Sequence, residues 1–185
     1  SRNENYWDGT PTWEEVTFRP IANEGARVAA LLAGDVDVIE TPPIQDFDRI
    51  RQEGKQIAQG LSNRVIYLHL DNNPEPGHVP PGVEGTDGKN PFTDVRVREA
   101  ISKAIDRQAI SDRIMGGLGV PAGDLLPYPM FGTREDTPVE QYDPDAARAL
   151  LEEAGYPNGF TLVLSSPNDR YMNDERVAQA VAQML

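Results

Sequence analysis

Apolar side chains recur at the three- and four-residue spacing of an amphipathic helix in several parts of the chain. Val28, Leu31 and Leu32 share one face of the segment 24–33, and Gly34 follows as a helix stop. Similar spacing, together with flanking polar and glycine residues, predicts further helices along the chain. These helices cover residues 46–53, 94–115, 143–154 and 174–185.

Two aspartates carry the clearest signals for the start of a helix. Asp143 is followed by Pro144, which places an N-cap next to a proline at the first helical position. Asp106 is the expected N-cap of a second helix inside the segment 94–115, and Gly116-Gly117 is expected to end that helix. These caps divide the second half of the chain into separate helices.

Other segments have the alternating or continuous apolar pattern of strands. These segments are residues 16–21, 35–40, 64–70 and 160–165. The segment 64–70 (RVIYLHL) is largely apolar on both faces, so we expect it in the centre of a sheet. The mixed order of helices and strands predicts an α/β fold with a mixed sheet.

Residues 71–93 form a long connection without a regular pattern. They contain five prolines and four glycines, and almost no apolar side chains. A connection of this length is unusual inside a compact domain. We therefore expect a domain boundary or a crossover here.

Composition narrows the classes of function. The chain has 185 residues, with 17 Lys and Arg against 30 Asp and Glu, and a formal charge of −13. This charge argues against a general nucleic-acid or anionic-membrane binder, because both need a basic face. The absence of cysteine excludes disulfides, thiolate zinc sites and a cysteine nucleophile.

The sequence lacks the usual signatures of catalysis. His69 and His78 are the two histidines, and they match no metal-ligand spacing. We expect His69 to be a packed or hydrogen-bonded residue of the sheet. The basic pair Arg96 and Arg98 lies in the first turns of a predicted helix, where a solvated or salt-bridged role is expected.

One polar segment joins a predicted strand end to the last helix, the position where ligands bind in α/β sheets. It combines hydrogen-bond donors and acceptors, a cation and an aromatic ring, a mixture that suits a small polar ligand. The alternative is a polar surface loop with Asn173 or Asp174 as a helix cap. The candidate ligand residues are Ser165, Ser166, Pro167, Asn168, Asp169, Arg170, Tyr171 and Asp174.

Several longer strings resemble one known family along nearly the whole chain. They are Asn5–Gly9 (NYWDG), 16–21 (VTFRPI), 26–37 (ARVAALLAGDVD), 91–101 (PFTDVRVREAI), 142–147 (YDPDAA) and 150–156 (LLEEAGY). In this order they resemble the family 5 extracellular solute-binding proteins, the receptors of ABC importers for peptides, nickel and oligosaccharides.

The resemblance implies part of a periplasmic-binding-protein-like class II architecture, with pieces of two lobes. Residues 1–73 would be the later part of the first domain in lobe I, and 74–90 a crossover loop near the hinge. Residues 91–185 would be the first half of the second lobe, domain III. Family members are much longer, so we expect the chain to be an internal piece of such a protein.

The function implied by the resemblance is that of a substrate-binding component, with peptide as the default solute. It would pass the solute to a membrane permease and an ATPase, from the periplasm or the outer face of the cytoplasmic membrane. We expect a monomer that is not an enzyme, with no cofactor, no metal site and no nucleic-acid partner. The alternatives are a carboxylate-based hydrolase, or a structural fragment without its own activity.

The resemblance also suggests roles for individual residues. Ser165, Ser166 and Pro167 would offer backbone contacts to the ligand, and Asp169 would pair with a ligand cation. Asp174 is the rival for that pairing. The arginines of the DVRVR string would serve the fold rather than the ligand.

Overall fold

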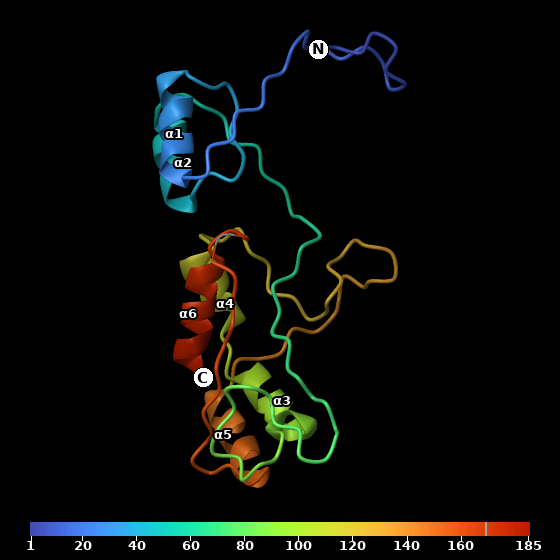
Figure 1. Ribbon diagram of the computed structural model, residues 1–185, viewed down its shortest axis with the longest axis vertical. Coiled ribbons are helices and arrows are strands. Elements are labelled where there is room, and N and C mark those ends of the chain that lie inside the picture. The colour runs from blue at the N-terminus through green and yellow to red at the C-terminus, as the bar shows by residue number, and fades with distance from the viewer. Residues whose placement is uncertain (169) are drawn as a thin grey trace. The chain divides into compact units, whose positions relative to one another are not determined.

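The computed structural model describes residues 1–168 and 170–185, which form two compact units (Figure 1). The first unit is Ser1–Ala58 and the second is Gln59–Leu185. Each unit has its own cluster of buried apolar side chains.

The first unit is built around two helices. α1 spans Glu24–Ala33 and α2 spans Phe47–Gln52, which follows a short 3-10 helix, η1, at Ile44–Asp46. Val28 and Leu31 of α1 pack with Ile50 of α2, so the predicted apolar faces meet. Both predicted helices are confirmed.

The ends of α1 follow from two residues. The side chain of Asn23 accepts a hydrogen bond from the Ala26 N–H at 2.9 Å, which satisfies one of the free donors of the first turn. Gly34 ends the helix at φ 80°, a left-handed conformation that glycine adopts without steric cost.

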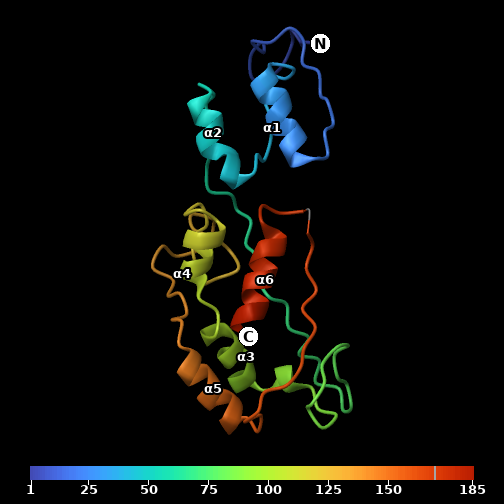
Figure 2. The same cartoon turned by 90° about the vertical axis from the view of Figure 1, so that its left-hand side faces the viewer.

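The second unit contains the remaining helices of the described residues. α3 spans Val95–Lys103, α5 spans Pro144–Glu153 and α6 spans Asp174–Met184. Figure 2 shows α3 beside α5, and α6 contacts the π-helical turn that follows the short α4. The buried cluster joins these helices through the side chains of Phe92, Val97, Ile101, Ile105, Val177 and Val181.

Short irregular helices connect the longer ones. The 3-10 helix η2 spans Pro91–Thr93, α4 spans Arg107–Ala109, and a π-helical turn, η3, spans Ile110–Ile114. The Asp106 side chain accepts from the Ala109 N–H at 2.8 Å, and the Asp143 side chain accepts from the Ala146 N–H at 2.9 Å. Both predicted N-caps are therefore confirmed.

The predicted mixed sheet is wrong: the described residues form helices, turns and extended chain, with no strand. The segments 16–21, 35–40, 64–70 and 160–165 pair with no neighbour over their length. An isolated antiparallel bridge joins Glu84 to Thr161 through two N–H to carbonyl bonds of 3.0 Å. Alternation favours an extended backbone, whereas a strand also needs a neighbour whose N–H and carbonyl groups match its own.

The segment 64–70 packs against the core through only part of its apolar side chains. Leu68 and Leu70, two residues apart, pack against the buried cluster of the second unit. Ile66 and Tyr67 are exposed, so the central position predicted for 64–70 is wrong. His69 is exposed as well, which corrects the expectation of a packed sheet residue.

The arginines of the DVRVR string bind the backbone of their own unit. Arg96 Nη1 donates to the Glu153 carbonyl at the end of α5 at 2.7 Å, and Arg96 Nη2 donates to Asp94 Oδ2 at 2.6 Å. Arg98 Nη1 donates to the Phe92 carbonyl at 2.7 Å. These contacts tie η2 and α5 to α3.

Candidate functional site

The candidate site is the loop of residues 165–174, called here the 165–174 loop. It leads from the extended segment 160–165 to the start of α6 (Figure 2). Ser165, Ser166, Pro167 and Asn168 are all exposed. The Ser166 hydroxyl donates to the Pro167 carbonyl at 2.9 Å. Asp169 lies outside the described residues.

Arg170 and Tyr171 form a stacked pair within the loop. The guanidinium carbon of Arg170 lies 5.2 Å from the centre of the Tyr171 ring. An arginine over an aromatic face is held by attraction to the ring, while the N–H groups at its edge still point outward in the guanidinium plane. The pair thus presents an aromatic surface and a planar hydrogen-bond donor side by side.

Asp174 turns inward, in contrast to the exposed residues before it. It is only 6% exposed, and its Oδ2 accepts from the N–H groups of Arg170 at 3.0 Å and Tyr171 at 2.9 Å. Its Oδ1 accepts from the Glu175 N–H at 2.8 Å. Burial raises the pKa of the Asp174 carboxyl, but these backbone donors outweigh burial and hold that pKa below its usual range.

Asn173 connects the loop to a different element. Its backbone is left-handed, with φ 55° and ψ 24°, a conformation that asparagine tolerates better than most residues. Its side-chain Nδ2 donates to the Ile114 carbonyl, at the end of η3, at 2.8 Å. The pattern at 165–174 gave no signal for this contact, since the two residues are 59 positions apart.

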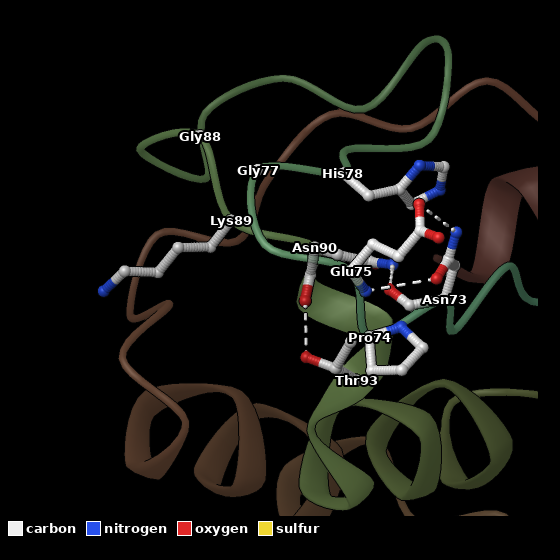
Figure 3. A pocket seen from close by; sticks show the side chains of 9 residues that line it. All are labelled: Asn73, Pro74, Glu75, Gly77, His78, Gly88, Lys89, Asn90 and Thr93. Atoms are coloured by element: carbon white, nitrogen blue, oxygen red, sulfur yellow. Dashed lines mark hydrogen bonds between the residues drawn. The ribbon is translucent and has the colours of Figure 1, made fainter.

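A separate cavity lies in the connection 71–93 (Figure 3). The cavity has a volume of about 250 Å³ and is lined by polar side chains. The Glu75 side chain lies between Asn73 and His78, whereas the Lys89 side chain points away from them. His78 Nε2 lies 2.9 Å from Asp71 Oδ2, and this hydrogen bond lowers the pKa of the Asp71 carboxyl.

The buried Asn90 side chain links the two ends of the connection 71–93. Asn90 Nδ2 donates to the carbonyls of Asp71 at 2.8 Å and Asn73 at 3.2 Å. The composition of the segment indicated a boundary, but it did not reveal this internal bonding.

A second cavity of about 320 Å³ lies between η3 and α6, and Ile110, Ile114 and Met184 are among the residues lining it.

Hydrogen bonds hold four carboxyl groups in their charged form by lowering their pKa values. The resolved pKa shifts of carboxyls among the described residues are all downward, at Asp71, Asp94, Glu140 and Asp174. A carboxylate-based hydrolase needs an acid whose pKa is raised. Within residues 1–168 and 170–185, no cluster of three or more His, Cys, Asp or Glu side chains is arranged to hold a metal ion.

None of the helices in the described part of the chain has the length and apolar character needed to cross a membrane.

The 165–174 loop therefore combines exposed backbone groups, a guanidinium and an aromatic ring, which are groups that can contact a polar ligand. The family model described as bacterial extracellular solute-binding proteins, family 5 middle, matches residues 1–185. The chain therefore belongs to family 5 of the bacterial extracellular solute-binding proteins. Members of this family are transport receptors rather than enzymes.

The names of individual relatives refer to different solutes. Heme-binding protein A of Haemophilus influenzae is 29% identical over 179 residues, covering 92% of this chain and 30% of the relative. The dipeptide-binding protein of Escherichia coli is 30% identical over 183 residues, covering 98% of this chain and 31% of the relative. The chain thus spans about a third of the length of these relatives.

A solved structure has a similar course of the chain. HbpA2 from Haemophilus parasuis matches with a TM-score of 0.55 and 26% identity, covering 98% of this chain and 34% of that one. The backbone course described above is therefore similar to that of HbpA2.

Proposed function

We propose that this chain is the middle part of a longer receptor that captures a small solute and delivers it to an ABC importer in the membrane. The family match over residues 1–185 carries this proposal. In such a receptor the solute lies between two lobes that close by a hinge motion. The receptor would act in the periplasm or at the outer face of the cytoplasmic membrane, as a monomer.

The division between lobes follows the family resemblance. By this resemblance residues 1–73 would belong to lobe I, residues 74–90 to the crossover near the hinge, and residues 91–185 to the second lobe. The compact units divide earlier, after Ala58, and Leu68 and Leu70 pack in the second unit. The Asn90 side chain supports an ordered crossover, since it ties the end of the 74–90 segment back to Asp71.

We assign solute contact to the 165–174 loop. The exposed backbone of Ser165, Ser166 and Pro167 offers donors and acceptors, and Asn168 adds an amide. The Arg170 and Tyr171 pair supports contact with an anionic or planar group of the solute. The loop therefore suits a small solute with both polar and charged groups.

The role of the acidic residue is assigned to Asp169 by family resemblance. Asp174 is the weaker candidate because its two oxygens already accept three backbone N–H groups of its own loop. Turning that carboxylate outward would break all three of these hydrogen bonds.

Peptide is the first solute to test. A peptide carries a carboxylate for Arg170, an ammonium group for an acidic residue and amides for the exposed backbone of the loop. The experiment is native mass spectrometry of the longer receptor, purified without refolding. A bound mass that matches short peptides supports the proposal, and a bound mass of another compound replaces peptide as the solute. Failure to find any ligand, followed by no thermal shift in a broad solute screen, would contradict the receptor function.

A further inference from the structure

The two residues that close the 165–174 loop, Asn173 and Asp174, have side chains directed at the protein rather than at solvent. We infer that they are positioning residues, which hold Arg170 and Tyr171 in their binding arrangement before any solute arrives. This inference rests on the proposed function of the loop.

Asp174 fixes the backbone of the stacked pair. One oxygen, Oδ2, accepts from the N–H groups of both Arg170 and Tyr171. Because one atom receives two consecutive N–H groups, the peptide planes on either side of Arg170 cannot rotate independently. The carboxylate is 6% exposed, so water competes little for these bonds.

Asn173 fixes the loop to the rest of the unit. In η3 the Met115 N–H donates to the Ile110 carbonyl, five residues back, so the helix ends there with a π-turn. The Ile114 carbonyl at this end receives the Asn173 amide at 2.8 Å. Asn173 therefore joins the start of α6 to the end of a helix that is distant in sequence.

The consequence for binding is preorganisation. A loop that is ordered by its own protein loses less conformational entropy when a ligand binds, so it binds more tightly with the same contacts. The pair Asn173 and Asp174 would thus affect affinity without touching the solute.

The variants are chosen to change one property each. Asp174→Asn keeps the size of the side chain but replaces one acceptor oxygen with a donor amide. Asn173→Asp keeps the size and the tolerance for positive φ, but it cannot donate to the Ile114 carbonyl. Asn173→Gly keeps the backbone conformation and removes only the side-chain tether. Asp143→Asn is the control, because the Asp143 carboxylate also accepts a backbone N–H, at the start of α5 and outside the loop.

Two readouts are measured on the longer receptor. The first is hydrogen exchange of the Arg170 and Tyr171 amides without any ligand. The second is calorimetric titration with the dipeptide Ala-Ala and with the solute that co-purifies. We expect exchange of these amides to become about tenfold faster in Asp174→Asn and in both Asn173 variants, and affinity to fall about tenfold. Asp143→Asn should leave both readouts unchanged, because asparagine caps a helix about as well as aspartate does.

Two outcomes overturn the inference. The first is unchanged exchange of the two amides in Asp174→Asn, because the carboxylate then does not hold the backbone. The second is faster exchange with unchanged affinity, because the arrangement then does not matter for binding. If the wild-type receptor binds neither probe, the proposed function of the loop is contradicted rather than this inference. The hydrogen-exchange rates of the Arg170 and Tyr171 amides would then show by themselves whether Asn173 and Asp174 order the loop.

Discussion

At the scale of single residues, stability depends on a few fully buried side chains and on carboxylates bonded to backbone donors. Val97 is fully buried and Ile101 nearly so on α3, whereas Val95 on the same helix is 62% exposed. Asp174 shows the second kind of contribution, since backbone donors hold its charge in a buried position. Each kind leads to a specific prediction.

Truncation of Ile101 should destabilise the chain strongly. Ile101→Ala removes buried methyl groups from the cluster that joins α3 to α6, and it leaves a cavity. We expect a loss of about 2–5 kcal/mol in the free energy of unfolding, measured by urea denaturation. Val95→Ala, on the same helix, should change that value by less than about 0.5 kcal/mol. Equal effects of the two variants would contradict the assigned core.

Acid should remove the contribution of Asp174. The folded pKa of this carboxyl is lowered relative to the ordinary value of about 3.9, so the group binds its proton more weakly in the folded state. Its stabilisation is therefore complete above about pH 4 and is lost as the pH falls through the lowered pKa. Urea denaturation of wild type and Asp174→Asn should show a stability gap at pH 7 that narrows below pH 4. A gap that is constant or widens on acidification would show that the charge is not what stabilises the loop.

At the scale of elements, loop and extended chain pack closely without a sheet. Gly82, in the connection 71–93, lies against Val163 of the extended segment 160–165. A Cβ built on Gly82 would come within 2.7 Å of the Val163 Cβ. The close approach of these two segments therefore needs a residue without a side chain.

Substitution of Gly82 tests this contact. Gly82→Ala should cost about 1–3 kcal/mol more stability than Gly88→Ala, because overpacking is added to the strain of a positive φ. Gly88 is the matched control: its φ is 73°, and a Cβ there meets no atom within 4 Å. The measurement is thermal and urea denaturation of both variants. Similar losses for the two alanine variants would contradict the close packing of the two segments.

The helices could be predicted from the sequence because their signals are local. The caps at Asp106 and Asp143 and the stop at Gly34 lie next to the elements they bound. The four predicted strands are wrong because a strand depends on pairing with a second segment, which the apolar pattern of one segment does not reveal.

The candidate site also has features that the sequence predicted and features that it could not predict. The polar mixture at 165–174 identified an exposed loop that the structure confirms as exposed at Ser165 to Asn168. The sequence left Asp169 and Asp174 as rivals for a ligand cation, and it offered Asn173 or Asp174 as a cap. The inward bonds of Asp174 and the contact of Asn173 with Ile114 depend on tertiary structure, so no local pattern could reveal them.

At the scale of the whole molecule, the chain consists of two compact units, and it spans about a third of the length of the relatives named above. Its formal charge of −13 and its family membership agree with a receptor for small solutes rather than a nucleic-acid binder. The central claim is that solute binding by the longer receptor depends on the 165–174 loop.

The measurement that tests this claim most directly is the dissociation constant of the co-purified solute for the longer receptor, for wild type and for Arg170→Ala. The matched control is Arg148→Ala, an exposed arginine on α5 that pairs with Asp145 at 2.8 Å. We predict that Arg170→Ala weakens binding at least tenfold, about 1.4 kcal/mol, because it removes a charged donor and the partner of the Tyr171 ring. Arg148→Ala should bind as wild type does. Equal dissociation constants for all three proteins would contradict the claim that this loop contacts the solute.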